Sequence, residues 1–157
     1  MAILLPPGRL VSMRDDLPAP LKPRFRAALA IVGGGLLSLL ALATQLQPDP
    51  SGLGTHRQLG IPECTFVQLF GRPCPTCGMT TSWAHVMRGE WKQAMRANSA
   101  GMMLALAACI VGPWLLAVAG RGRWIGWKPT EVNVAVMAII VIGVTLLDWL
   151  RRLMMNE

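Results

Sequence analysis

The stretch that decides the fold is Ala27–Leu46, AALAIVGGGLLSLLALATQL, which contains no charged residue. In helical form, roughly 20 apolar residues match the ~30 Å hydrocarbon core of a bilayer. Two further runs have the same character: residues 97–120 carry no charge, and residues 132–150 carry only Asp148. The sequence therefore predicts an all-α, polytopic membrane protein with three transmembrane helices.

The composition points the same way. The chain has 157 residues, of which 53% are hydrophobic and 15% are charged, whereas soluble domains usually carry about 25% charged residues. The formal net charge of +7 fits basic residues that flank membrane spans and contact lipid phosphates. A nucleic-acid partner would need a basic face on a soluble fold, so we expect none. The expected partner is the lipid bilayer, with a second copy of the chain or another membrane protein beside it.

The chain divides into a tail, one membrane domain and a short end. Residues 1–26 mix prolines with charged residues, and such a proline density does not sustain a helix, so we expect a disordered basic tail. Its first apolar residues are too few for the ~7–15-residue core of a signal peptide, and we expect the first span to be retained. The membrane domain covers 27–150, and 151–157 form a C-terminal tail. Basic residues are spread almost evenly over both sides, so neither orientation is favoured.

Small residues recur at every fourth position in the first two spans: Ala30, Gly34 and Ser38, then Gly101, Ala105 and Cys109. Such strips let two membrane helices approach closely, so we expect them to pack against each other, with Cys109 as a packing residue. Near the end of the third span, Asp148 precedes Arg151 and Arg152 by three and four residues. Helical ion pairs at this spacing offset the charge of the carboxylate, which favours a structural role for Asp148.

The chemically competent groups concentrate in Gly71–Thr81, GRPCPTCGMTT, between the first and second spans. Proline is favoured at the first position of a helix, so the sequence predicts an amphipathic interfacial helix over about 75–96, with Cys74 as its N-cap and Cys77 in its first turn. Its expected membrane-surface residues are two tryptophans and a basic stripe: Trp83, Trp91, Arg88, Lys92 and Arg96. This pattern is typical of a helix lying flat on a membrane, and also of a helix covering other protein, while Gly89 weakens the middle.

The cysteines of this stretch support two kinds of chemistry. A thiolate at a helix N-terminus is stabilised by free N–H groups, which lowers its pKa. Cys74 and Cys77 could therefore form a readily reduced disulfide, with Cys64 as a resolving thiol. Alternatively the same three cysteines supply metal ligands, and zinc is the candidate ion. A third interpretation is a purely structural staple of the loop.

A closed zinc site needs four ligands, and the chain offers two histidines for the fourth position. His85 lies eight residues after Cys77, roughly 12 Å along a continuous helix, so we do not expect it to share a metal with that cysteine. His56 lies in the loop before Cys64 and could reach the site.

The stretch resembles an uncharacterised family of small bacterial membrane proteins, domain of unknown function 2752. The family signature combines an upstream cysteine, Gly-x-x-Cys-Pro-x-Cys-Gly-(Leu/Met)-Thr and a later Gly-(Asp/Glu)-aromatic element with Ala and Asn. The matching residues here are Cys64, Gly71, Cys74, Pro75, Cys77, Gly78, Met79, Thr80, Gly89, Glu90, Trp91, Ala94 and Asn98. Thr81 and Ser99 depart from the arginine and proline common at these positions, so an anion-binding role is not carried over. The resemblance implies a bacterial cell membrane and no established activity.

Three functions compete at this point. The first is a non-enzymatic accessory or structural membrane protein with a structural or metal-binding cysteine motif at the membrane surface. The second is a membrane thiol–disulfide oxidoreductase, although such enzymes usually have more spans and a second cysteine pair. The third is a transporter, which three spans with a single buried charge do not favour.

Overall fold

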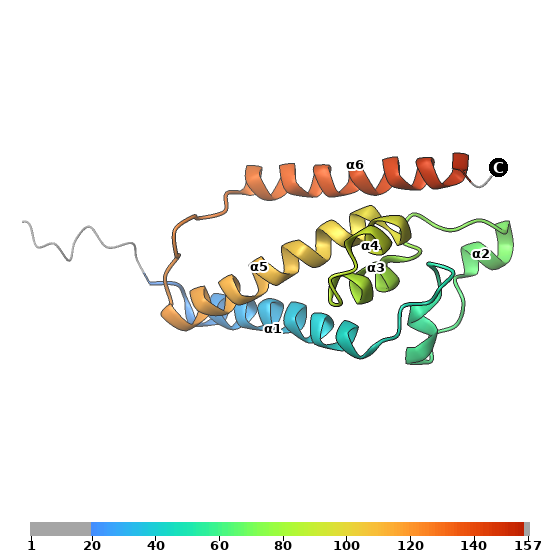
Figure 1. Ribbon diagram of the computed structural model, residues 1–157. Coiled ribbons are helices and arrows are strands. Elements are labelled where there is room, and N and C mark those ends of the chain that lie inside the picture. Colours follow the sequence, from blue (N-terminus) through green and yellow to red (C-terminus); the bar gives the residue numbers. More distant parts are fainter. Residues whose placement is uncertain (1–19, 156–157) are drawn as a thin grey trace, which may run out of the picture.

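The computed structural model describes residues 20–155, and within that range the chain forms helices and no strands. Three long helices dominate Figure 1: α1 (Pro23–Gln45), α5 (Ser99–Arg121) and α6 (Glu131–Met155). Each is long and apolar enough to cross a membrane, with mean hydropathies of 2.1, 2.2 and 2.1 in chain order. These helices confirm the prediction of an all-helical membrane protein with three candidate spans.

Four short helices connect α1 to α5: the 3-10 helix η1 (Thr55–Leu59), α2 (Thr65–Phe70), α3 (Met79–Val86) and α4 (Trp91–Ala97). Figure 1 shows α3 and α4 beside the first turns of α5, and η1 and α2 beyond the end of α1. Most of the predicted tail, residues 1–19, lies outside the described residues. Helix α1 begins earlier than predicted, at Pro23, because a proline at the first helical position has no N–H that would need a partner.

Helices α1 and α5 pack antiparallel, as expected, but through different residues. A Cβ on Gly33 would lie 2.9 Å from the carbonyl oxygen of Gly112, whereas Gly34 has nothing within 4 Å. Ala105 is buried in the contact, but Cys109 is exposed. The predicted strips are therefore wrong in part. Small residues occur on more than one face of each helix. The two helices pack through the faces that carry Gly33 and Gly112, because these glycines let the two backbones come close together.

Hydrogen bonds join the residues at the start of α1 to the last backbone carbonyls of α5. The Arg26 guanidinium donates hydrogen bonds to the carbonyl oxygens of Ala119 (2.8 Å) and Gly120 (3.0 Å). The Leu21 N–H donates to the Gly122 carbonyl oxygen (2.8 Å). The last carbonyls of a helix have no partner within the helix, and a cation there also interacts favourably with the helix dipole. The start of α1 is thereby fixed to the end of α5.

The predicted interfacial helix over 75–96 is two helices, α3 and α4, that pack against each other. Gly89 adopts a φ of +73° in the turn between them, a conformation that glycine reaches without strain. The Ser82 hydroxyl lies 2.9 Å from the carbonyl oxygens of both Ala94 and Asn98, to which it is hydrogen-bonded. Ala84 is fully buried in the same interface. Helix α3 is therefore an internal helix, because its small residues allow α4 and α5 to close over it.

The residues expected at the membrane surface are divided between the two helices. Trp83 on α3 is half-buried and packs against the core cluster. Arg88 donates to the Ala84 carbonyl oxygen (2.9 Å) and so caps α3. Arg88 lies in the turn after α3 and is itself exposed, as are the other three residues, which lie on α4: Trp91, Lys92 and Arg96.

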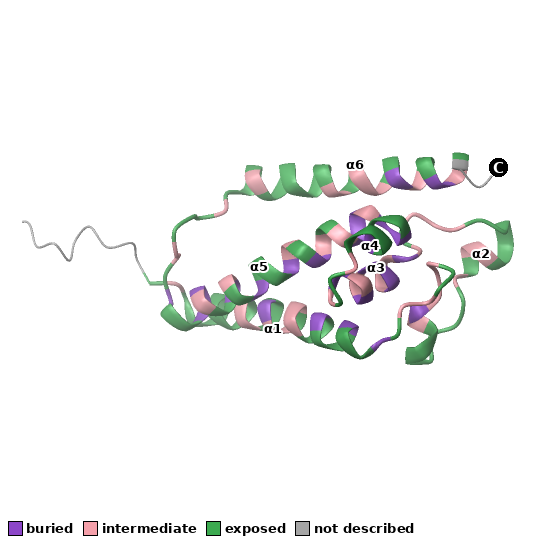
Figure 2. Ribbon diagram, in the orientation of Figure 1, coloured by how far each residue is buried: buried purple, intermediate pink, exposed green. Residues whose placement is uncertain are grey.

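Helix α6 contacts the remainder of the described chain mainly near its C-terminal end. Figure 2 shows its buried positions gathered there, and its first turns are mostly exposed. Asp148 and Arg152 are buried, with 5% and 9% of their surfaces exposed. The predicted ion pairs are confirmed, because Asp148 lies 2.9 Å from Arg151 and 3.0 Å from Arg152.

Candidate thiol site

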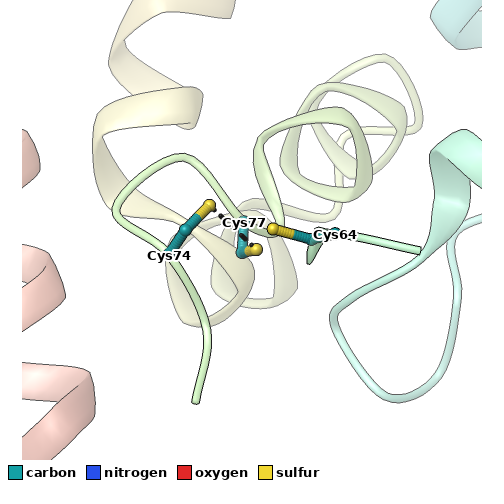
Figure 3. Close-up of side chains that lie close together, drawn as sticks. All are labelled: Cys64, Cys74 and Cys77. Carbon is teal, nitrogen blue, oxygen red and sulfur yellow. Dashed lines mark hydrogen bonds between the residues drawn. The ribbon is translucent and has the colours of Figure 1, made fainter. Parts of the chain in front are cut away.

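Three thiols from two segments converge beside the starts of α2 and α3, near residues of the C-terminal part of α6. The Sγ atoms of Cys64, Cys74 and Cys77 all lie within 4.8 Å of one another (Figure 3). Cys64 caps the start of α2, and the other two belong to the turn before α3. The sequence predicted these three residues as the candidate site, and their sulfurs are close enough to act together on one ligand.

The turn that carries Cys74 and Cys77 lies outside the helix. The Cys77 N–H donates to the Cys74 carbonyl oxygen (3.1 Å), and the Met79 N–H donates to the Thr76 carbonyl oxygen (3.1 Å). The N-cap of α3 is Gly78, with φ +84°. The predicted N-cap role of Cys74 and the placement of Cys77 in a first helical turn are therefore wrong. Pro75 begins a tight turn in place of a helix, because this glycine redirects the chain three residues later.

Gly78 is fixed by space as well as by its dihedral angle. A Cβ at this position would lie 2.5 Å from the Ala97 carbonyl oxygen and 2.9 Å from the Gly52 carbonyl oxygen. Both contacts are shorter than real Cβ atoms show, and both partners are backbone atoms that cannot rotate away. Only glycine lets the thiol turn approach the end of α4 and the 47–63 loop together.

Polar side chains from α5 and α6 hold the carbonyl groups of the thiol turn. The Arg152 guanidinium donates to the carbonyl oxygens of Cys77 (2.9 Å) and Pro75 (3.1 Å). The Asn98 amide, which is fully buried, donates to the same two oxygens at 3.1 and 3.2 Å. The Trp149 indole N–H donates to the carbonyl oxygen before Cys74 (2.8 Å). The backbone of the turn is therefore held in a clamp by residues of α6 and by Asn98 at the start of α5, and these bonds do not involve its thiols.

Sequence reasoning did not find the clamp. Asn98 was part of the family signature, but nothing assigned it a partner. The arginine and tryptophan of α6 lie 75 or more positions from their acceptors. Asp148 acts on the clamp indirectly, because its ion pair holds the Arg152 side chain in place. The sequence did contain one indication of the clamp: Asp148 lies beside two arginines near the end of an apolar run. Charged residues in membrane spans usually pair with other groups of the protein, so a polar contact with another segment could have been expected there.

The two thiols of the turn differ in acidity. Burial raises the pKa of Cys74, but hydrogen bonds with Cys77, Thr76 and Cys64 outweigh it and lower that pKa from 9.0 to about 7. Burial, and then the hydrogen bond with Cys74, raise the pKa of Cys77 to about 12. Their sulfurs lie 3.0 Å apart. At neutral pH Cys77 therefore keeps its proton, while about half of the Cys74 thiols are ionised.

A cavity of about 220 Å³ opens beside the thiols. It is lined by His56, Cys64, Cys74, Thr76, Cys77, Gly78, Met79, Thr80 and Thr81. A smaller cavity of about 120 Å³ lies next to it and shares His56, Cys64 and Cys77. The volume and the polar groups are sufficient for an ion with its ligands or for a small molecule.

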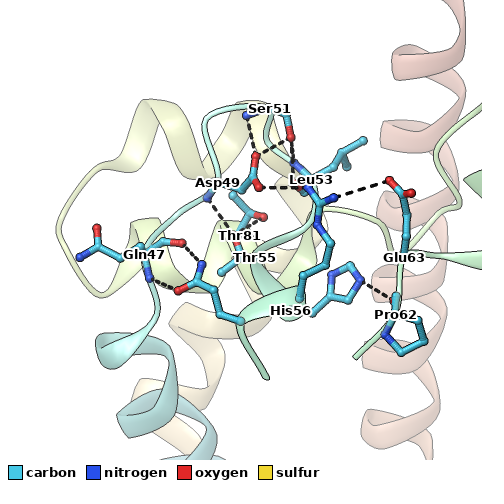
Figure 4. Close-up of polar contacts among 11 residues, drawn as sticks. Gln47, Asp49, Ser51, Leu53, Thr55, His56, Pro62, Glu63 and Thr81 are labelled. Atoms are coloured by element: carbon cyan, nitrogen blue, oxygen red, sulfur yellow. Dashed lines mark hydrogen bonds and ion pairs between the residues drawn. The ribbon is translucent and has the colours of Figure 1, made fainter. Parts of the chain in front are cut away.

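The 47–63 loop forms one side of this cavity and is ordered by polar contacts (Figure 4). Thr55, which has no exposed surface, shares a 2.8 Å hydrogen bond with the hydroxyl of Thr81 on α3. Its hydroxyl also accepts the Asp49 N–H (2.9 Å). Thr81 is the position where the family signature commonly has arginine, so in this chain the departure creates a direct bond between loop and helix.

The remaining sequence candidates lie elsewhere. The His85 Nδ1 pairs with the Glu90 carboxylate at 2.5 Å, across the turn between α3 and α4. Cys109 is exposed on α5. Among the described residues, neither joins the thiol cluster. His85 was expected to be separate from Cys77, and that expectation agrees with the structure for a different reason, because the helix carrying it starts after Gly78 and turns its ring toward Glu90.

The comparisons with known proteins agree with the resemblance drawn from the sequence. The profile of the family described as protein of unknown function (DUF2752) matches residues 64–112. The match begins at the first thiol of the cluster and ends inside α5, so it contains the thiol turn, Asn98 and helices α2 to α4. No curated protein and no solved structure matches the chain. The chain thus resembles a family of unknown function over the segment that builds the site.

Proposed function

We propose that the chain is a non-enzymatic protein of the bacterial cell membrane whose three thiols bind one soft metal ion, with zinc as the first candidate. The ion would fasten the segment before α2 to the turn before α3 at the membrane edge. The three apolar helices support a lipid environment. Bacterial origin and the cell membrane follow from the family resemblance.

The observation that carries the proposal is the convergence of three sulfurs within 4.8 Å. Zinc–sulfur bonds of about 2.3 Å place two sulfur ligands of a tetrahedral ion roughly 3.8 Å apart. The cluster is therefore of the right size for one ion. The Sγ atoms of Cys74 and Cys77 lie 3.0 Å apart, so they need to separate by roughly 0.8 Å to bind the same ion. Thiolates are the preferred ligands of zinc and other soft ions, and the low pKa of Cys74 supplies one of them at neutral pH.

The rigid surroundings of the turn support a site built for an ion. Arg152, Asn98 and Trp149 bind its carbonyl groups, not its sulfurs. A residue that binds a metal needs a fixed backbone and a donor atom that is free to bind the ion. Side chains that hydrogen-bond the backbone carbonyls of the turn, and not its sulfurs, provide both conditions. The same contacts place the cluster between α5 and α6, so an ion there would also strengthen the packing of these two candidate spans.

A second function, thiol–disulfide exchange, is favoured by one specific observation. The pKa of Cys74 is lowered to about 7 while that of Cys77 is raised to about 12. This difference suits a nucleophilic thiolate and a protonated partner thiol. In that case Cys74 would attack a disulfide of another protein, Cys77 would then displace the bound sulfur, and the partner would leave as a dithiol. Alternatively Cys64, as the resolving thiol, would displace the partner's sulfur from Cys74 and form a Cys64–Cys74 disulfide.

Metal content of purified variants separates these functions. The proposal expects one metal ion per chain in the wild type and in Cys109→Ser, whose sulfur lies outside the cluster. Cys64→Ser, Cys74→Ser and Cys77→Ser should each lose most of it. A wild-type protein that contains no metal and forms a Cys74–Cys77 disulfide, reversibly reduced by a dithiol, would support the second function and overturn the first.

A further inference from the structure

We propose that His56 is the fourth ligand of the metal site, which makes it a closed zinc site of three cysteines and one histidine. This inference rests on the proposed metal-binding function. It concerns a residue outside the segment that the family profile matches, since that match begins at Cys64.

His56 faces the thiols across a shared cavity. It lines the ~220 Å³ space together with all three cysteines, and the ~120 Å³ space together with Cys64 and Cys77. Among the described residues, the group whose ligand atoms all lie within 4.8 Å of one another consists of the three cysteines and does not include His56. To bind the same ion as the thiols, the imidazole would have to move toward them across this shared cavity.

The hydrogen bond of the ring leaves the correct nitrogen available. The Nε2 atom lies 3.2 Å from the Pro62 carbonyl oxygen (Figure 4). A carbonyl oxygen only accepts, so Nε2 must be the protonated nitrogen of the neutral ring, and Nδ1 then carries the free lone pair. Histidines that bind metals commonly donate their other ring N–H to a backbone carbonyl in this way, which fixes both tautomer and orientation.

The segment carrying His56 is attached to the helix that follows the thiol turn. Thr55, its immediate neighbour, bonds the Thr81 hydroxyl at 2.8 Å with no exposed surface. Arg57, the neighbour on the other side, pairs with Asp49 at 3.3 Å. The backbone on both sides of the histidine is therefore held close to the cavity, which lowers the entropy lost when the ring binds an ion.

The other histidine of the chain provides a matched control. The chain contains two histidines, and His85 pairs with Glu90 away from the cluster. Any imidazole bound to a metal in the untagged protein must therefore come from one of these two rings. Replacing each in turn assigns the ligand even if one of the variants fails to fold.

The test is X-ray absorption spectroscopy of the zinc-loaded full-length chain, purified in detergent without a histidine tag. We expect three sulfurs at about 2.3 Å and one imidazole nitrogen at about 2.0 Å. The imidazole scattering should persist in His85→Ala and disappear in His56→Ala, with an oxygen in its place. A wild-type site of three sulfurs and one oxygen, or imidazole scattering lost in His85→Ala, would overturn this inference and leave the three-thiol site intact. A chain that binds no zinc would overturn the proposed function itself.

Discussion

Replacement of Arg152 by methionine tests whether α6 holds the thiol turn. The arginine side chain is 10% exposed and lies 3.0 Å from the Asp148 carboxylate, whose side chain is 2% exposed. Methionine preserves much of the apolar stem but removes the charge and the hydrogen bonds to the Cys77 and Pro75 carbonyl oxygens.

The magnitude follows from which groups lose their partners. Removing one member of a buried ion pair costs about 3–5 kcal/mol, because the other charge remains buried. Asp148 keeps Arg151 at 2.9 Å, and both carbonyl oxygens keep the Asn98 amide. The expected loss is therefore at the lower end, about 3 kcal/mol. For a chain of this size that corresponds to a fall in melting temperature of roughly 6–12 °C.

The assay is thermal unfolding of the variants in the same detergent micelles, with Arg151→Met as the matched control. Arg151 pairs with the same carboxylate, but its side chain is 45% exposed, and solvent screens such pairs to about 0–1 kcal/mol. The double replacement Asp148→Leu with Arg152→Leu should recover part of the loss, because the charge that remains, that of Arg151, is solvent-exposed and no buried charge is left unpaired. Equal melting temperatures for Arg152→Met and Arg151→Met would refute the clamp.

Three further predictions concern the thiol turn itself. In reduced, metal-free protein, alkylation of Cys74 followed by peptide mapping should reach half its maximum near pH 7, while Cys77 stays largely unreacted, because their pKa values are about 7 and about 12; a shared midpoint near 9 would contradict this. Since the folded pKa of Cys74 lies below the ordinary pKa of 9.0, its contribution to stability is complete above pH 9 and is lost as pH falls to about 7. Gly78→Ala should lower the free energy of unfolding by at least about 2 kcal/mol more than Gly89→Ala. Both glycines have positive φ, but a Cβ added at Gly78 would lie 2.5 Å from the Ala97 carbonyl oxygen, whereas one added at Gly89 would have nothing within 4 Å. Equal losses in denaturant titrations would show that the close approach is unimportant.

The three long helices were predictable because membrane spans are determined by local composition. An uncharged run such as 27–46 satisfies its backbone hydrogen bonds within itself, so no distant residue is needed to define it. The pairing of Asp148 with Arg151 and Arg152 was predictable for the same reason, since helical spacing alone brings the three together.

The contacts that build the site were not predictable, because they join distant parts of the chain. The residues around Pro75 do not show that it begins a turn and not a helix. The turn depends on the positive φ of Gly78 and on its close approach to the Ala97 carbonyl oxygen, where a Cβ has no room. The choice of Gly33 over Gly34 likewise depends on Gly112 across the helix pair. Motif spacing identified the three cysteines, whereas the residues that hold their backbone come from α5 and α6 and are revealed only by the fold.

The most direct test of the central claim is native mass spectrometry of the purified wild-type chain, combined with elemental analysis and thiol trapping before and after mild oxidation. The account predicts one metal ion per chain that survives the oxidant. It also predicts that Cys64, Cys74 and Cys77 are protected from alkylation and Cys109 is modified. A metal-free chain, whose Cys74 and Cys77 alternate between a disulfide and two free thiols, would contradict it.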